Sequence, residues 1–136
     1  MDLVRFGRLS RLRQAEVKWV MRESLDFLTR HPFLVLHRQD IPTPGAPVVY
    51  VGRPSQWGNP FPLEAYDNQA GQARIHCLQD YTANLLYGTH VPLLREVVYL
   101  TDKRLSCWCR TQRQFQAERL CHADILCGLA HGVAVL

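Results

Sequence analysis

The sequence predicts a single small α/β domain with an additional N-terminal helix. Short hydrophobic segments alternate with segments of helical periodicity, which favours a short, at least partly parallel sheet with flanking helices. A chain of 136 residues is long enough for one hydrophobic core but not for two. We therefore expect a Rossmann-like α/β domain over residues 33–136, preceded by a basic amphipathic helix within residues 1–32.

The N-terminal helix is predicted from about Ser10 to Arg30. Its apolar residues recur at helical spacing and form one stripe that can pack on the rest of the domain: Val17, Val20, Met21, Leu25 and Leu28. A different face carries four basic residues: Arg8, Arg11, Lys18 and Arg22. His31-Pro32 ends the helix, because the residue before a proline is pushed out of the helical conformation.

Two strands and two helices are expected next. The strands are Phe33–His37 and Val48–Val51, joined by a stiff proline-rich connection, and they are candidates for direct neighbours in the sheet. A helix follows from about Gln69 to Tyr87, with the next glycine as its left-handed C-terminal cap. A shorter helix begins near Pro92, whose missing N–H is harmless in a first turn.

The last strand and the last helix enclose the most unusual part of the sequence. The strand is predicted over Leu105–Cys109. In the helix, Cys121 occupies the cap position and Asp124 lies in the first turn, while Leu120 and Ile125 are spaced to form a hydrophobic staple. Gly132 then ends the helix.

The composition excludes several classes of protein. Hydrophobic residues at 47% and charged residues at 21% are ordinary for a globular domain, which excludes a disordered chain. No apolar run is long enough to cross a bilayer and no secretory signal is apparent, so we expect a cytoplasmic protein without membrane association. Five cysteines, an odd number, exclude a complete disulfide framework and favour reduced thiols.

Three cysteines and one histidine have a spacing that suits a shared site. Alternate side chains of a strand project to the same side, so Cys107 and Cys109 would share a face and could meet Cys121 and His122. These four side chains are candidate ligands for a tetrahedral zinc ion. An iron–sulfur cluster on the three cysteines is a weaker alternative.

Two other interpretations of this cluster stay open. At a helix N-terminus, Cys121 would face unpaired backbone N–H groups and the positive end of the helix dipole, which stabilise a nucleophilic thiolate that His122 could assist. Alternatively, the cysteines are small buried hydrophobic residues. Cys77 and Cys127, each within a helical pattern, are assigned to packing.

The irregular loop over residues 53–61 follows a strand, where ligands of open α/β sheets bind. Its candidate substrate-binding residues are Arg53, Ser55, Trp57 and Asn59. The arginine matches phosphate or carboxylate, the serine and asparagine offer hydrogen bonds, and the tryptophan offers a face for base stacking. The structural alternative is a rigid turn whose aromatic residues fill the core and whose arginine pairs with an acid such as Asp124.

Three motifs, GRPSQWGNPF at Gly52–Phe61, LSCWC at Leu105–Cys109 and CHADIL at Cys121–Leu126, resemble the domain-of-unknown-function family numbered 4326. The resemblance covers roughly residues 33–131. It implies no established activity, but the small phage and bacterial proteins of this pattern imply a role close to nucleotide or nucleic-acid metabolism. The segment Arg110–Leu120, which looks longer than the family's usual link, carries three arginines: Arg110, Arg113 and Arg119.

These features favour a small hydrolase or transferase that acts on a nucleotide, nucleobase or nucleic-acid substrate. The catalytic candidates are Cys121, His122 and Asp124, with either a metal-activated water or the Cys121 thiolate as nucleophile. Two alternatives stay open. One is a non-catalytic nucleic-acid-binding protein with structural zinc, whose basic N-terminal helix contacts phosphates. The other is an interaction module whose apolar helix stripe docks on a protein partner or a second copy of the chain.

Overall fold

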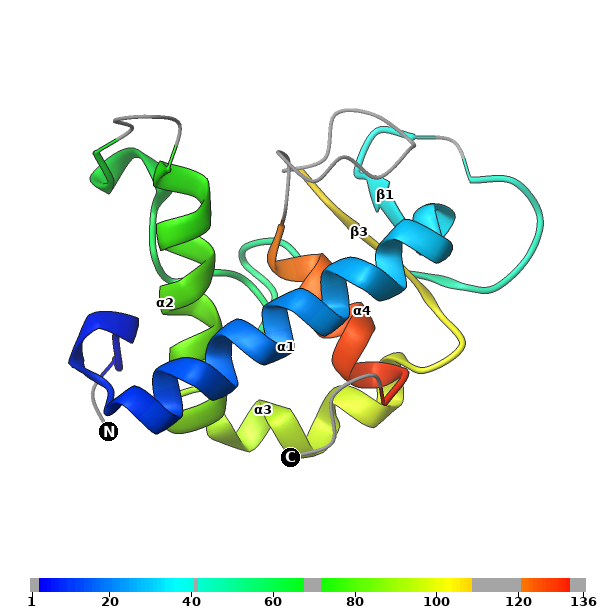
Figure 1. Ribbon diagram of the computed structural model, residues 1–136. Helices are drawn as coiled ribbons and strands as arrows, with labels where there is room; N and C mark the ends of the chain where they lie inside the picture. The colour runs from blue at the N-terminus through cyan, green and yellow to red at the C-terminus, as the bar shows by residue number, and fades with distance from the viewer. Residues whose placement is uncertain (1–2, 41, 68–71, 109–120, 133–136) are drawn as a thin grey trace.

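The computed structural model describes residues 3–40, 42–67, 72–108 and 121–132. A sheet of three strands is formed by β1 (Val35–His37), β2 (Val48–Tyr50) and β3 (Arg104–Cys107). The helices are α1 (Arg11–Arg30), α2 (Ala73–Tyr87), α3 (Val91–Glu96) and α4 (His122–Ala130), as Figure 1 shows. Short 3-10 helices lie at Phe6–Arg8, Pro32–Leu34, Leu63–Ala65 and Val97–Leu100. The predicted α/β domain with an N-terminal helix is confirmed.

All three strands are parallel, in the spatial order β1-β3-β2. The expectation that the first two strands are direct neighbours is therefore wrong, because Leu105 of β3 pairs with Val35 on one side and Val49 on the other. Leu105 is fully buried, whereas Val48 at the start of β2 is exposed, so the most completely buried strand takes the centre of the sheet. The carboxyl ends of the strands consequently share one edge, where ligands of such sheets bind.

The N-terminal helix shares the hydrophobic core with the sheet and the other helices. Val17, Val20 and Leu28 are fully buried in the cluster that also contains Leu105 and Ile125. Figure 1 shows α1 running across α2 and α4, and it packs on both. The apolar stripe proposed for a partner is thus used inside the chain, so a partner would have to bind another face of α1.

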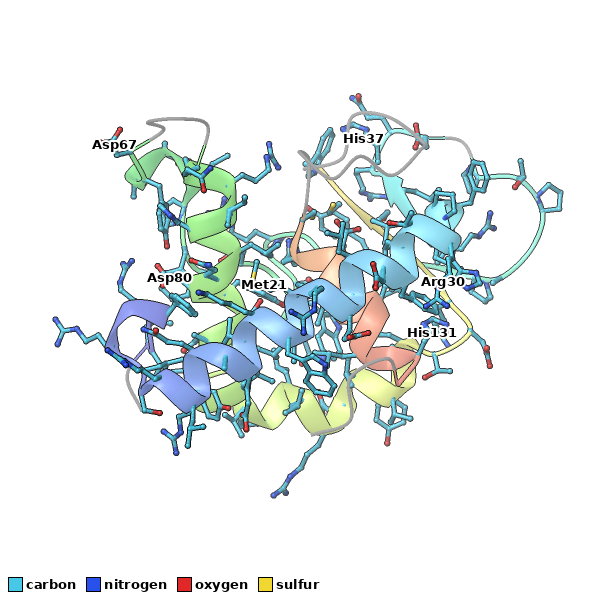
Figure 2. The ribbon with its side chains drawn as sticks, viewed as in Figure 1. Met21, Arg30, His37, Asp67, Asp80 and His131 are labelled. Atoms are coloured by element: carbon cyan, nitrogen blue, oxygen red, sulfur yellow. The ribbon has the colours of Figure 1, made fainter. Side chains whose placement is uncertain are left out.

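The segment before α1 is held against α2 by hydrogen bonds to two buried side chains of that helix, Asp80 and Asn84. The carboxylate of Asp80 accepts from the backbone N–H of Phe6 at 2.8 Å and pairs with the Arg5 guanidinium at 3.1 Å. Asn84 Oδ1 accepts from the backbone N–H of Val4 at 3.0 Å. Burial and the hydrogen bond to Asp80, which Figure 2 labels, raise the pKa of Tyr66 above its ordinary value, which keeps the Tyr66 hydroxyl protonated as a donor.

Several predicted boundaries differ from the structure. The strand predicted from Phe33 begins only at Val35, because Pro32–Leu34 forms a 3-10 helix. Gly88 is not left-handed, since its φ is −121°. Its small size matters instead, because a Cβ there would lie 2.1 Å from Asn84 Oδ1. Gly132, with a φ of 69°, does follow α4 in the left-handed conformation.

Three of the predicted features fall in undescribed parts of the chain. The start of the Gln69–Tyr87 helix, the last strand residue Cys109 and the staple residue Leu120 all lie outside the described residues. Among the helices that are described, none has both the length and the apolar character needed to cross a bilayer.

Gly128→Ala is expected to lower the free energy of unfolding by about 1–3 kcal/mol, the usual cost of overpacking. The added Cβ would lie 2.3 Å from Ser24 Oγ and 2.9 Å from Ser24 Cα, at the crossing of α1 and α4. Urea unfolding followed by circular dichroism measures the change. Gly7→Ala is the matched control, because a Cβ there meets nothing within 4 Å. Equal stability changes in the two variants would contradict tight packing at this crossing.

Candidate functional site

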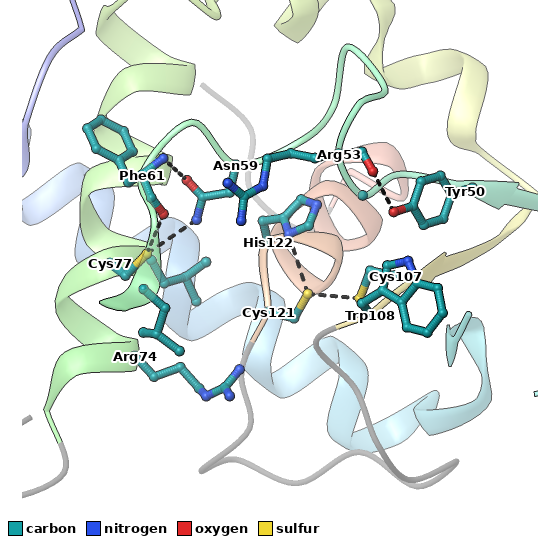
Figure 3. Close-up of a pocket in the computed structure, with 13 residues that line it drawn as sticks. Tyr50, Arg53, Asn59, Phe61, Arg74, Cys77, Cys107, Trp108, Cys121 and His122 are labelled. Carbon is teal, nitrogen blue, oxygen red and sulfur yellow. Dashed lines mark hydrogen bonds between the residues drawn. The ribbon is translucent and has the colours of Figure 1, made fainter. Parts of the chain in front are cut away.

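A cleft of about 180 Å³ lies at the carboxyl edge of the sheet. Its described walls come from the ends of β2 and β3, the loop over residues 51–61 and the first turns of α2 and α4. Five of the residues predicted from the sequence line it: Arg53, Asn59, Cys107, Cys121 and His122 (Figure 3). The structure therefore brings the cysteine motif and the loop to one place.

A second hollow, of about 760 Å³, lies between the end of α1 and the connection from β1 to β2. Its described lining includes three prolines and four titratable side chains, Arg30, His31, Asp40 and Arg104, but no cysteine. The smaller cleft is therefore the candidate site, because it holds the cysteine thiols together with a histidine.

Cys121 forms the N-cap of α4 and points its sulfur into the cleft. Its Sγ accepts from the backbone N–H of Ala123 at 3.5 Å, and the Asp124 carboxylate accepts from the backbone N–H of Cys121 at 2.9 Å. This reciprocal capping box confirms the predicted cap and first-turn positions. The N–H groups and the dipole of α4 favour negative charge on the sulfur.

His122 is oriented by Val51, the residue that follows β2. Its Nε2 lies 2.8 Å from the carbonyl oxygen of Val51, which can only accept, so the ring donates there. Its Nδ1 lies 3.4 Å from Cys121 Sγ and is placed to take the thiol proton. The ring of Tyr81 packs edge-on against the imidazole, with ring centroids 5.2 Å apart. The two residues thus form a thiol–imidazole pair with a fixed geometry.

Cys107, at the end of β3, lies next to Cys121 with the two sulfurs 3.1 Å apart. Across the described part of the chain, no group of three or more His, Cys, Asp or Glu side chains is arranged to hold a metal ion. Cys109, the remaining candidate ligand, falls outside the described residues. The zinc and iron–sulfur interpretations of the sequence stay predictions.

The mouth of the cleft carries two arginines and a tryptophan. Arg53 extends into it from the 51–61 loop and Arg74 from α2, as Figure 3 shows. Trp108 is 55% exposed there, and its ring stands edge-on to the ring of His37 at 5.5 Å. Sequence reasoning missed both Arg74 and Trp108. In a continuous strand, Trp108 would project to the side opposite Cys107, but β3 ends at Cys107 and the chain bends at Trp108.

The other predicted binding residues are placed differently. Trp57 is only 6% exposed and fills the core, as the structural alternative for this loop expected, and neither it nor Ser55 lines the cleft. Asn59 does line it, with Oδ1 accepting from the Phe61 N–H at 2.9 Å and Nδ2 donating to Cys77 Sγ at 3.4 Å. Asn59 therefore shapes the wall of the cleft.

Two glycines allow the loop to fold tightly around Arg53. A Cβ on Gly58 would lie 2.7 Å from Arg53 Cγ, and one on Gly52 would lie 2.4 Å from the hydroxyl oxygen of Tyr50. That hydroxyl donates to the carbonyl oxygen of Arg53 at 2.7 Å. The absence of these two side chains is what lets the arginine reach the cleft from the end of β2.

A family model described as "Domain of unknown function (DUF4326)" matches residues 35–132. This range contains the whole described lining of the cleft and leaves out α1. No curated protein and no solved structure matches the chain significantly.

Asp124→Ala is expected to lower the free energy of unfolding by about 0.5–2 kcal/mol, as the loss of a helix cap does. The buried carboxylate holds the Cys121 N–H and does not line the cleft, which makes Asp124 a positioning residue. Asp124→Asn keeps a carbonyl acceptor and should lose less stability. Thermal unfolding of both variants measures this difference. An alanine variant as stable as the wild type would refute the capping role.

Proposed function

The chain belongs to the DUF4326 family, and we propose that its cleft is the active site of a thiol-dependent enzyme for a nucleotide, nucleobase or nucleic-acid substrate. The position of Cys121 carries this proposal. Its sulfur lies at a helix N-terminus, 3.4 Å from Nδ1 of His122, in a cleft that Arg53 and Arg74 also line. An activated thiol and two guanidinium groups suit covalent chemistry on an anionic substrate.

The thiol proton moves to Nδ1 of His122, because Nε2 is already committed to the Val51 carbonyl. The Val51 carbonyl then stabilises the imidazolium, while the N–H of Ala123 and the dipole of α4 stabilise the thiolate. The nucleophile and its base are thus adjacent in the sequence. The start of α4 positions both residues, and Val51, which follows β2, orients the imidazole.

The thiolate attacks an electrophilic carbon of the substrate. A C–S bond forms as the bond to the leaving group breaks, and the leaving group departs with the electron pair and takes the proton from His122. Water then gives a proton to the neutral imidazole and attacks the same carbon, which returns the electron pair to Cys121. The net reaction is hydrolysis, and an acceptor other than water gives group transfer.

The mouth of the cleft supports a nucleotide or a nucleic acid as the substrate. The planar guanidinium groups of Arg53 and Arg74 can each form paired hydrogen bonds to phosphate oxygens, and a base can stack on the exposed ring of Trp108. The cleft volume of about 180 Å³ is close to that of a cavity of about 150 Å³ that holds benzene. One ring-sized group therefore fits inside, with the phosphate against the arginines.

Iodoacetamide is expected to alkylate Cys121 faster than Cys127, which lies in the same helix away from the cleft. His122→Gln should slow this alkylation on the order of tenfold or more, because the thiol loses its base. Fragmentation mass spectrometry of the C-terminal tryptic peptide separates the two cysteines. Cys127→Ala is the matched control and should keep the wild-type rate. Equal rates at Cys121 and Cys127 would refute the proposed nucleophile.

Arg53→Ala and Arg74→Ala are each expected to raise the Kd of a nucleoside monophosphate roughly tenfold to a hundredfold. A hydrogen bond to a charged group contributes about 1.5–3 kcal/mol, which gives that range. Calorimetric titration with a panel of nucleoside monophosphates measures the Kd. Arg95→Ala, an exposed arginine of α3, is the control.

Trp108→Ala is expected to weaken the same binding by about 1–3 kcal/mol through the loss of stacking. Substitution of the buried Trp57 by Phe leaves the cleft mouth intact and serves as the comparison. Binding to oligonucleotides that falls steeply with salt and survives Arg53→Ala would instead favour the non-catalytic nucleic-acid-binding protein.

A further inference from the structure

Cys107 takes no part in the proposed mechanism, although its sulfur touches the nucleophile. We propose that Cys107 and Cys121 give the site a second, redox activity: Cys121 reduces hydrogen peroxide, and Cys107 then closes a disulfide that reversibly blocks the nucleophile. This inference rests on the same reactive Cys121 thiol as the proposed function, but it needs no organic substrate.

The two sulfurs are placed to bond. Cys107 and Cys121 come from the end of β3 and the start of α4, and their Sγ atoms lie 3.1 Å apart in the buried floor of the cleft. Figure 3 shows both sulfurs side by side beneath the imidazole of His122. A disulfide bond is about 2.05 Å long, so the sulfurs need to approach by only about 1 Å.

The environments of the two thiols assign the order of reaction. Cys121 is the group beside the Nδ1 of His122 and the N-terminus of α4, both of which favour its thiolate. Cys107 is fully buried at the end of the central strand, with its sulfur against that of Cys121. A small peroxide entering the cleft therefore meets the Cys121 thiolate first, with Cys107 held beside it as the resolving thiol.

The reaction balances in two steps. The Cys121 thiolate attacks one oxygen of hydrogen peroxide, the O–O bond breaks, and the departing hydroxide takes the proton of His122 and leaves as water. Cys121 is thereby oxidised to the sulfenic acid by two electrons. The Cys107 sulfur then attacks the Cys121 sulfur, the S–O bond breaks, and the thiol proton leaves with the hydroxyl group as a second water. An added dithiol such as dithiothreitol restores both thiols and is itself oxidised.

The other described cysteines provide the controls. Cys77 also lines the cleft, but its Sγ donates to the carbonyl oxygen of Phe61 at 3.2 Å and accepts from Asn59. Cys127 lies farther along α4, with His131 Nδ1 at 3.9 Å from its sulfur. Cys109 falls outside the described residues and is a competing resolving thiol that the experiment must separate from Cys107.

The test treats the full chain with one equivalent of hydrogen peroxide, blocks remaining thiols with N-ethylmaleimide and maps disulfides by mass spectrometry. Trypsin leaves Cys107 with Cys109 in one peptide and Cys121 with Cys127 in another, so the link is assigned from fragmentation spectra. We expect a Cys107–Cys121 disulfide, and alkylation of Cys121 by iodoacetamide that falls at least about tenfold and recovers with dithiothreitol.

The variants separate the roles of the cysteines. Cys107→Ser should abolish the disulfide and leave Cys121 sulfenic acid that dimedone traps, whereas Cys77→Ser, Cys109→Ser and Cys127→Ser should keep the Cys107–Cys121 link. Because the link is read directly in the wild type, the test does not depend on the folding of any one variant.

Two results would overturn this inference: no disulfide at all, or a link from Cys121 to Cys109. Rapid alkylation of reduced Cys121 alongside either result would refute the redox activity and leave the proposed function standing. Slow alkylation of reduced Cys121 together with a Cys107–Cys121 link would refute the proposed function and keep the disulfide.

Discussion

The cap that Cys121 places on α4 is the interaction on which both the fold and the site depend. Cys121 starts the helix with two hydrogen bonds: its N–H donates to the Asp124 carboxylate, and its Sγ accepts from the N–H of Ala123. The same residue supplies the thiol of the cleft. The same helix buries Ile125 and Leu126 in the core. A shift of the sulfur would therefore disturb the cap and the packing behind it, which keeps the thiol in one position.

The helix outside the family match contributes to this rigidity. α1 packs on α4, and the contact between Gly128 and Ser24 is so close that a Cβ on the glycine has no room. Since α4 carries Cys121 and His122, the position of the thiol–imidazole pair is set partly by a segment that the family model does not include. In this chain the N-terminal helix is part of the support of the site.

Local signals in the sequence are sufficient to predict the ends of α1 and the cap of α4. A serine, a proline and a capping box each act over only a few residues, so no knowledge of the tertiary packing is needed. Strand order was not predictable in this way, because it depends on which strand is most completely buried. Two of the three tryptophans show the same limit of prediction from local signals. Trp57 and Trp108 both lie in irregular segments, but only the packing of the whole chain decides that the first fills the core and the second stays exposed. Arg74 had no local signal among 16 lysines and arginines.

The electrostatics of the cleft are compatible with both parts of the proposed function, a reactive thiol and an anionic substrate. Proton transfer from Cys121 to His122 creates one negative and one positive charge side by side, so the pair adds no net charge to the cleft. Burial, with the nearby sulfur of Cys121 as a smaller cause, raises the pKa of Tyr81, which therefore stays neutral and donates to the Trp57 carbonyl. Tyr81 therefore presents an uncharged ring to the imidazole of His122. Arg53 and Arg74 then remain as the positive groups at the described mouth. Because the thiol–imidazole pair adds no net charge, the charge of the two arginines is available to the phosphate of the proposed substrate.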